Sequence, residues 1–290
     1  MGVTLFHHPD AGPDAWSADR LLEGLRRGGF SASYCCVDEA GWEDALEHTR
    51  DLAIVAGGDG TVAKLVRAFQ GDVVPIAILP TGSANNIARS LGAFASLDEV
   101  IRGLRNATNT GFRVGSARGC WGERQFVEAI GLGALARSVA ELQDAKLDGL
   151  EKLQSGRAAL RSAIANAQPV RAAVHLDGER LETPALLIEV MNIPMIGPNI
   201  RLCSDHDLAD EMLSVVYLPI DGQEAMLTWL DGPEANGPAP VRTFRCRRVR
   251  IEAENEPLRF DDKTAEWDGS SVVLQREPNM VTVLVPRRHT

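Results

Sequence analysis

The chain has no apolar run that approaches the ~18 residues a membrane-spanning helix needs. Met1-Gly2-Val3 leads directly into an expected strand, so a secretory signal segment is not expected either. These absences favour a cytoplasmic protein. Any membrane contact would be peripheral, at the inner membrane face.

Cysteine is sparse and basic residues are outnumbered. Five cysteines, an odd number without a Cys-x-x-Cys pair, argue against a zinc knuckle or a disulfide framework. Thirty Lys and Arg against forty Asp and Glu give a formal net charge of −10. Because phosphate backbones demand basic surfaces, nucleic acid is not an expected partner. The same charge provides no general attraction to anionic lipid.

Strand and helix patterns alternate over the first ninety residues, which predicts a parallel sheet covered by helices on both faces. After about residue 110 the pattern changes to short strands separated by turns. We therefore expect an α/β fold in which a parallel-sheet nucleotide-binding domain (1–115) precedes a mostly antiparallel β-rich domain (116–290). The last strand could also return to the first domain.

Three segments of the second half receive specific predictions. A helical stretch over 134–167 is expected to break near Gly149 and Gly156. Residues 221–241, rich in Gly and Pro, are expected to form an exposed loop. A strand over 243–253 should carry a bulge at Arg247-Arg248, where the apolar residues change face.

The first motif with chemical content is Gly-Gly-Asp-Gly-Thr, at 57–61. It follows a buried strand and opens a helix. Glycines let a backbone approach phosphate closely, and free amides at a helix start favour an anion. Asp59 cannot itself cradle phosphate, so we expect it to accept from a nucleotide hydroxyl or to arrange Mg²⁺. A bare turn with a surface aspartate is the alternative.

A second motif repeats this arrangement at 79–92, where a strand is followed by Pro80-Thr81-Gly82-Ser83 and a helix. An N-capped helix entered through a turn explains part of the pattern. Two such loops at one edge of a sheet favour a phosphate site.

Together the two loops resemble the catalytic domain of diacylglycerol kinases, sphingosine kinases and bacterial lipid kinases, whose fold is shared with NAD kinases. The segments at 8–12, 126–133, 190–216 and 281–286 resemble further motifs of that family, in the same order. His8 stands where asparagine is usual. The resemblance implies ATP as the phosphoryl donor, with Mg²⁺. The implied nucleotide-binding residues are His8, Gly57, Gly58, Gly60, Thr61, Thr81, Gly82, Ser83 and Asn85.

Several acidic positions of the family are changed here. Asn86 and Arg113 stand where aspartate is frequent, and Lys64 stands where glutamate is usual. The resembling family has an Asp-Gly-Glu turn near the C-terminus, which is its general-base site. In this chain, Asp261-Asp262-Lys263-Thr264 stands at about that point. We therefore expect the catalytic carboxylates to be Asp59 together with Asp262 or Glu266, unless the base has been lost.

A second acidic group, Asp205, Asp207 and Asp210, lies where the resemblance implies a structural or regulatory Mg²⁺. Carboxylates with a backbone carbonyl suit a hard cation. A solvated acidic loop is the alternative. The arginine-rich segment 242–250 is interpreted as an exposed strand face, with lipid headgroup contact as the alternative.

The leading hypothesis is an ATP-dependent kinase that phosphorylates the hydroxyl of a diacylglycerol-like or sphingoid lipid. A nucleotide-binding pseudokinase is the main rival, because acidic positions are missing. An NAD kinase-like enzyme is the third, although its Asn-Glu motif lacks a matching context at Asn255-Glu256-Pro257. The sequence leaves a homodimer open.

Overall fold

A computed structural model of the chain describes residues 1–11, 16–142, 149–181, 184–197, 199–204, 206–232, 237–253 and 256–287. The chain divides into two compact units. The first contains Met1–Phe112 and Asn279–Thr290, and the second contains Arg113–Pro278. The chain leaves the first unit inside β5 (Thr108–Gly119) and returns to it inside β18 (Val272–Val285).

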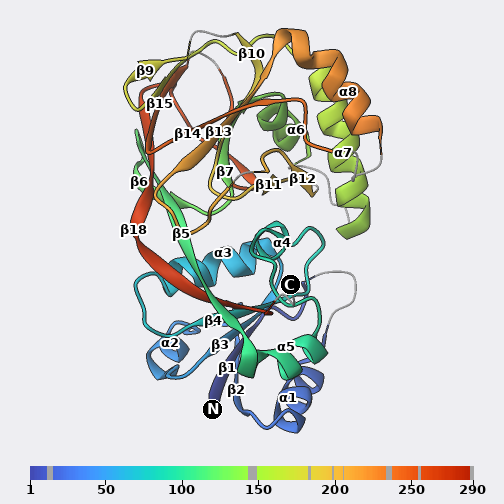
Figure 1. The fold of residues 1–290 in the computed structure, drawn as a ribbon, viewed down its shortest axis with the longest axis vertical. Coiled ribbons are helices and arrows are strands. Elements are labelled where there is room, and N and C mark those ends of the chain that lie inside the picture. The colour runs from blue at the N-terminus through green and yellow to red at the C-terminus, as the bar shows by residue number, and fades with distance from the viewer. Residues whose placement is uncertain are drawn as a thin grey trace. The chain divides into compact units, whose positions relative to one another are not determined.

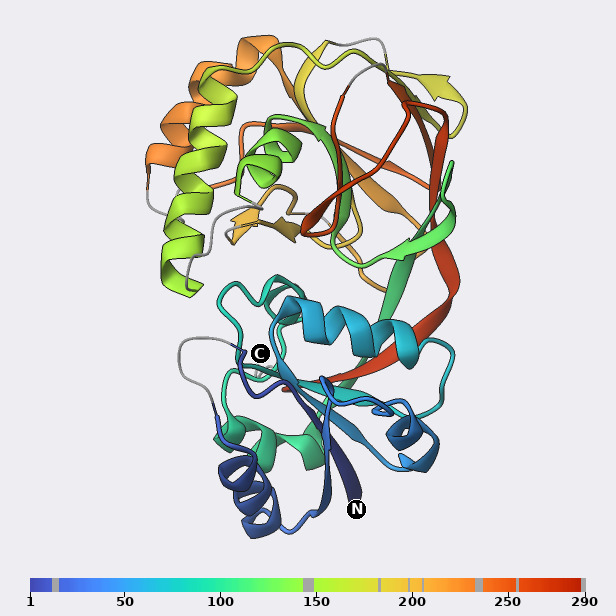
Figure 2. The ribbon, with the colours of Figure 1, turned by 180° about the vertical axis from the view of Figure 1, so that it is seen from behind.

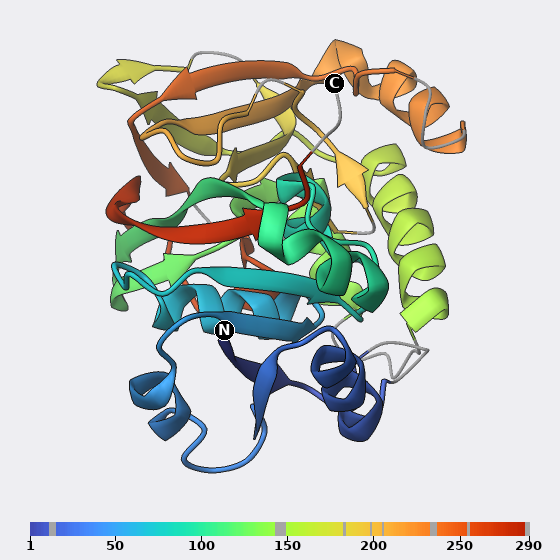
Figure 3. The same cartoon turned by 60° about the horizontal axis from the view of Figure 1, so that its bottom comes forward.

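The first unit is built on a parallel sheet in the order β2-β1-β3-β4-β18 (Figures 1 and 3). Its last strand comes from the C-terminal end of the chain, where Val283 pairs with Ile76 of β4. The other four strands are β1 (Gly2–His7), β2 (Ser31–Cys36), β3 (Ala53–Gly57) and β4 (Ile76–Pro80). A parallel strand needs a crossover connection, and the expected helices supply it.

Helices cover this sheet on both faces because its central strands β3 and β4 are apolar and buried on both faces. On one face, residues such as Leu5 and Ile54 pack against α1 and α5. On the other, Phe6 makes edge contacts with Trp42 and Phe69 near α2 and α3. The helices are α1 (Ala18–Arg27), α2 (Asp44–His48), α3 (Asp59–Ala68), α4 (Asn86–Leu91), α5 (Leu97–Gly103) and the 3-10 turn η1 (Leu104–Asn106).

The second unit contains an antiparallel sheet in the order β14-β13-β10-β7-β16-β17. A second layer consists of β18, β15, β8 and β9, with β5 pairing β18 and β6 pairing β5. The strands not yet given are β6 (Gly122–Phe126), β7 (Ala129–Gly133), β8 (Ala172–Leu176), β9 (Glu179–Arg180), β10 (Ala185–Met191), β13 (Leu213–Pro219), β14 (Arg242–Cys246), β15 (Arg248–Ala253), β16 (Leu258–Phe260) and β17 (Lys263–Ala265). A short hairpin pairs β11 (Met195–Ile196) with β12 (Ile200–Arg201).

The central strands of the six-stranded sheet, β7, β10 and β13, are buried on both faces. The inner face of the sheet packs against the second layer through a core that includes Ile130, Val190 and Val249. Helices cover its other face, where Leu160 and Met226 join the core (Figure 2). These helices are α6 (Ala134–Leu142), α7 (Gly149–Ala165) and α8 (Gln223–Asp231), the last preceded by η2 (Ile220–Gly222). No helix within the described ranges is long and apolar enough to span a membrane.

Three local predictions are corrected by the structure. The expected bulged strand over 243–253 is two strands, because the chain leaves the six-stranded sheet after Cys246 and enters the other layer at Arg248. The expected loop over 221–241 contains α8, whose Met226 and Leu230 are buried. The expected break at Gly156 is absent, since α7 runs through it. The predicted fold class, a parallel sheet followed by an antiparallel one, is confirmed.

Candidate functional site

Two loops of the first unit begin where neighbouring parallel strands end. β3 ends at Gly57 and β4 ends at Pro80, and these residues are partners in the sheet register. The amide of Thr81 donates to the carbonyl of Gly57 at 3.1 Å. Ligands of open parallel sheets bind beyond the carboxyl ends of strands. Both predicted loops therefore lie at the edge where a ligand is expected.

The loops touch at Gly58 and Gly82. A Cβ added to Gly82 would lie 2.4 Å from the Cα of Gly58, and one added to Gly58 would lie 3.2 Å from the Cα of Gly82. A side chain at either position would push the loops apart. Gly60 differs, because its Cβ would have no heavy atom within 4 Å. The backbone at Gly60 is therefore open to an approaching phosphate.

Asp59 joins the two loops. It is the first residue of α3, and its Oδ1 accepts the backbone N–H of Ile87 at 2.9 Å. Burial raises the pKa of Asp59, while hydrogen bonds from the backbone N–H groups of Ile87, Asn86 and Asn85 act in the opposite direction. Its carboxylate thus caps the start of α4, where Asn86 is buried. This gives Asp59 a positioning role, and its expected part in arranging metal and phosphate stays a prediction.

Asn85 shapes the second loop from its left-handed conformation, with φ of 54°. Its side chain accepts from the amide of Gly82 at 3.0 Å and donates to the carbonyl of the same residue. In the same loop the Oγ1 of Thr81 is buried and has no hydrogen-bond partner in the described part of the chain. A buried hydroxyl of this kind is one that a bound ligand can satisfy.

The other three predicted nucleotide-binding side chains differ in their surroundings. Thr61 is buried, with its side chain packed over Gly57. Ser83 is half-buried in the second loop. His8 follows β1, and its Nε2 lies 3.4 Å from a carboxylate oxygen of Asp38. Thr61 therefore supports the first loop, whereas Ser83 and His8 keep exposed surface.

Two basic residues at positions that are acidic in the resembling family have structural partners. Lys64 donates to a backbone carbonyl at 2.6 Å, and its Nζ lies 4.0 Å above the ring of Trp42. Arg113, in the second unit, donates to the carbonyls of Ala209 at 2.7 Å and Glu277 at 3.0 Å. Both changes are thus accommodated within the fold.

The second unit carries the carboxylates considered as a general base. Asp262 and Glu266 are both exposed, in and just after the β16–β17 hairpin. Between Asp262 and β16 stands Asp261, whose Oδ1 accepts the amides of Val127 at 3.0 Å and Glu128 at 2.8 Å. Asp261 is thus the carboxylate that the fold holds in place, and sequence reasoning did not single it out. No local sequence signal distinguishes it from Asp262, because the amides that hold it lie more than 130 positions away.

Of the three predicted metal ligands, Asp205 lies outside the described residues. Asp207 accepts a backbone N–H two residues ahead at 2.9 Å. Asp210 pairs with Arg245 and, at 3.0 Å, with Arg276. Burial lowers the pKa of Arg276 to about 10, so its guanidinium stays charged at neutral pH. Among the described residues no group of three His, Cys, Asp or Glu could hold a metal. The magnesium site stays a prediction.

The arginine-rich segment 242–250 is largely balanced by acidic neighbours. Its arginines form ion pairs with Asp210, Glu211 and Glu252. This pairing leaves less unbalanced positive charge for lipid headgroups and favours the solvated strand face.

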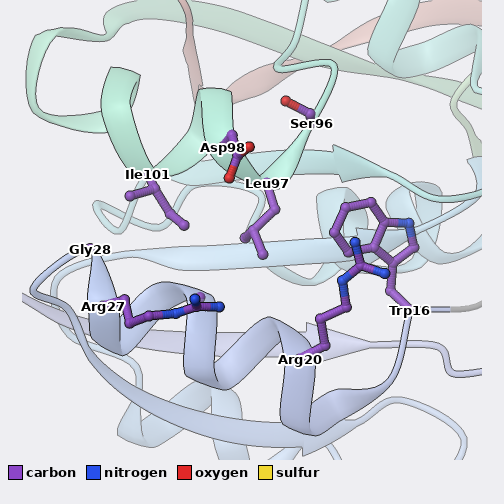
Figure 4. A pocket seen from close by; sticks show the side chains of 9 residues that line it. Trp16, Arg20, Arg27, Gly28, Ser96, Leu97, Asp98 and Ile101 are labelled. Atoms are coloured by element: carbon purple, nitrogen blue, oxygen red, sulfur yellow. The ribbon is translucent and has the colours of Figure 1, made fainter.

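A separate groove of about 360 Å³ lies between α1 and α5 (Figure 4). The guanidinium of Arg20 sits 4.5 Å from the ring centre of Trp16 at one end, and Leu97 and Ile101 line the side formed by α5. It contains none of the residues predicted to bind nucleotide.

Family models match most of the chain. The model of the diacylglycerol kinase catalytic domain matches residues 32–117, and the model of the YegS C-terminal NAD kinase beta sandwich-like domain matches residues 128–285. The second match alone covers more than half of the chain. The chain belongs to the diacylglycerol kinase-like family. The family predicted from the two glycine loops is thereby confirmed.

Individual proteins of the family and of the fold are similar to this diacylglycerol kinase-like chain over most of its length. A diacylglycerol kinase of Mycobacterium tuberculosis is 25% identical over 224 residues, covering 72% of this chain and 69% of that protein. One from Bacillus subtilis is 24% identical, covering 74% and 72%. The structure of a diacylglycerol kinase from Bacillus anthracis superposes with a TM-score of 0.70 at 17% identity, covering 98% and 96%. An NAD kinase from Archaeoglobus fulgidus in complex with ATP shares the fold, with a TM-score of 0.54 at 14% identity and coverage of 99% and 94%.

Proposed function

We propose that this diacylglycerol kinase-like chain is an ATP-dependent lipid kinase. It would transfer the γ-phosphoryl group to the hydroxyl of a diacylglycerol-like or sphingoid lipid, in the cytoplasm or peripherally at the inner membrane face. The observation that carries the proposal is the contact of two glycine loops at Gly58 and Gly82, each loop opening a helix. Relatives named diacylglycerol kinase support the class of acceptor.

The two loops have the features that a nucleotide requires. Gly60 offers open space beside the backbone, and Thr81 offers a buried hydroxyl without a protein partner among the described residues. Mg²⁺ bound with ATP would neutralise charge on the phosphates. The residues proposed to contact the nucleotide are His8, Gly57, Gly58, Gly60, Thr61, Thr81, Gly82, Ser83 and Asn85.

Transfer itself requires positioning and one proton acceptor. The lipid oxygen attacks the γ-phosphorus, the bond to the ADP oxygen breaks, and the hydroxyl proton passes to a carboxylate. Asp59 would serve by holding the second loop against the first. Asp262 and Glu266 remain candidates for the acceptor. Asp261 joins them because two backbone amides already fix its orientation.

A nucleotide-binding pseudokinase has its own support. Lys64 and Arg113 replace acidic residues of the family and are engaged in structural contacts. A chain that kept the fold but lost phosphotransfer would retain such contacts. An NAD kinase-like activity has less support, because Glu256 of its Asn-Glu motif is paired with Arg137 at 3.0 Å.

Calorimetry with ATP, followed by transfer of labelled γ-phosphate to vesicles containing diacylglycerol or sphingosine and, separately, to NAD, tests the proposal. We expect ATP binding and transfer to one lipid class. Binding of ATP without transfer to either lipid or to NAD would favour the pseudokinase. Transfer to NAD alone would favour the NAD kinase-like enzyme. Absence of ATP binding would contradict all three.

The proton acceptor is identified by three variants of an active protein. Asp261→Asn, Asp262→Asn and Glu266→Gln each remove one candidate carboxylate. The variant that loses the base should lower kcat by ~10²–10⁴-fold while its ATP affinity stays near wild type. Asp59→Asn should also remove nearly all turnover, because it removes the charge proposed to arrange metal and phosphate while leaving an oxygen that can accept the Ile87 amide. If all three hairpin variants keep at least a third of wild-type kcat, the base lies elsewhere.

A further inference from the structure

The buried guanidinium of Arg276 lies against the segment that carries Asp207 and Asp210. Arg276 is on β18, and its side chain is fully buried. Its N–H groups point to five oxygen atoms at 2.6 to 3.0 Å. These oxygens are the backbone carbonyls of Asn192, Asp207 and Asp210, the side-chain Oδ1 of Asn192 and the Oδ1 of Asp210.

The carboxylate of Asp210 has further partners. Asp210 Oδ1 also accepts the amide of Met212 at 2.8 Å, and its Oδ2 is held by Arg245. The Nε2 of His206 lies 2.7 Å from the Arg276 guanidinium. A divalent cation on Asp210 would have to displace two arginines. The described residues of this loop therefore do not fit the magnesium site that the family resemblance implied.

The oxygens around Arg276 are nevertheless the donor set of a hard cation, which takes backbone carbonyls, amide oxygens and carboxylates. Here the positive charge belongs to a side chain with five N–H donors in a fixed plane. We propose that the guanidinium of Arg276 takes the place of a divalent cation, so that five oxygens from Asn192, Asp207 and Asp210 are organised without metal.

Arg276 is also connected to Asp261, through Asn192. The Nδ2 of Asn192 donates to the carbonyl of Val127 at 3.0 Å, and its backbone amide donates to the carbonyl of Glu128 at 2.8 Å. The amides of Val127 and Glu128 in turn hold the carboxylate of Asp261. Arg276 is thus linked to Asp261 through Asn192 and the backbone of Val127 and Glu128.

Metal dependence is tested by thermal unfolding of the nucleotide-free protein in EDTA and in excess MgCl₂ or CaCl₂. Leaving ATP out keeps the nucleotide-bound metal out of the measurement. The variants are Arg276→Ala, Arg276→Lys and the control Arg248→Ala, which removes an exposed arginine from the neighbouring strand β15.

We expect the Tm of the wild type and of Arg248→Ala to be the same in EDTA and in either salt. Arg276→Ala should unfold on the order of 10 °C lower in EDTA, because it leaves buried acceptors unpaired. Mg²⁺ or Ca²⁺ should restore part of that loss by entering the vacated site. Arg276→Lys, which keeps a charge but fewer donors, should lie between the wild type and Arg276→Ala and show no metal effect.

The proposal is overturned if either salt raises the Tm of the wild type and EDTA reverses it. It is also overturned if Arg276→Ala is as stable as Arg248→Ala, or if neither cation raises its lowered Tm. Should Arg276→Ala not fold, the wild type and Arg276→Lys still decide, because stabilisation of either by a cation contradicts the proposal. None of these readouts depends on kinase activity.

Discussion

At the scale of single residues, the contact between Gly58 and Gly82 determines how the two loops meet. Neither glycine has a positive φ, so the requirement is for space and not for an unusual backbone conformation. Gly60, two residues further along the first loop, meets no such restriction. Gly58 and Gly82 are therefore required for packing, whereas Gly60 leaves the backbone open to a ligand.

Two alanine variants distinguish these roles. Gly82→Ala should lower the free energy of unfolding by roughly 1–3 kcal/mol, because its Cβ would overlap the backbone of Gly58. Gly60→Ala should leave stability unchanged or raise it by up to about 1 kcal/mol, since alanine is favoured over glycine in a helix. If phosphate approaches at Gly60, this variant should still bind ATP more weakly. Urea unfolding and calorimetry measure the two effects, and a Gly82→Ala protein as stable as wild type would contradict the loop contact.

His7 predicts an acid-sensitive contribution to stability. Burial lowers the pKa of His7 below its ordinary value of 6.5, with His8 adding to the shift. Well above pH 6.5 the imidazole is neutral in both states, and its contribution is complete. As the pH falls below 6.5, the unfolded chain takes up a proton that the folded chain does not. Stability is then lost by at most about 1.4 kcal/mol per pH unit.

The variant His7→Gln isolates this term. Glutamine can bond to the hydroxyl of Tyr34, which lies 3.2 Å from His7 Nδ1, but it does not titrate. Urea unfolding of both proteins between pH 7 and pH 5 should show a shallower decline for the variant. Parallel pH profiles would show that His7 makes no titrating contribution.

The glycine loops could be predicted from sequence because their signals are local: a buried strand, a glycine run and a helix start within a few residues. Asp261 could not be distinguished from Asp262 in this way. Its orientation depends on the amides of Val127 and Glu128, more than 130 positions away in the sequence. A one-residue difference in a hairpin becomes visible only with that partner in place.

At the scale of elements, three strands of the second unit share one row across the sheet. Gly131 of β7 is the register partner of Glu189 on β10 and of Arg259 on β16. A Cβ on Gly131 would lie 2.1 Å from the Glu189 carboxylate. Because this glycine has no side chain, Glu189 and Arg259 meet across the central strand at 2.6 Å, both buried. The ion pair thus joins β10 and β16, the two strands that flank β7.

A double-mutant cycle tests this row. Glu189→Leu or Arg259→Met alone should cost about 3–5 kcal/mol, because each leaves a buried charge unpaired. The double variant should cost clearly less than the sum of the two. The matched control is Glu123→Gln in the exposed pair with Arg118, which should change stability little. Urea unfolding measures the wild type and these four variants, and additive losses would show that the two side chains do not stabilise each other.

The same scale shows where sequence patterns were insufficient. The change of face at Arg247-Arg248 was visible, but a bulge and a transfer between two sheets give the same pattern in one strand. The helix at 223–231 was hidden because its short apolar face lies between Gly- and Pro-rich flanks. Its burial depends on Leu160 and Ile164 of α7, which are distant in sequence.

At the scale of the whole molecule, the first unit is not a continuous stretch of sequence. Its sheet is completed by the end of β18, where Val281 and Val283 are fully buried and Val283 pairs with Ile76. The amide of Gly71 also donates to the carbonyl of Met280 at 3.3 Å. The parallel sheet therefore needs residues that follow the whole second unit in the chain.

This arrangement predicts that a fragment of residues 1–112 is incomplete without the C-terminal strand. Burying the valines of that strand should contribute about 5 kcal/mol, which is comparable with the total stability of a small domain. We expect the fragment alone to unfold without a cooperative transition.

A peptide of residues 279–287 should restore a transition whose Tm rises with peptide concentration, by linkage of binding to folding. The same peptide carrying Val283→Asp should fail, because it places a charge at a fully buried position of the sheet. Circular dichroism against temperature measures each mixture. A fragment that unfolds cooperatively at the same Tm with and without the peptide would show that β18 is not required by the first unit.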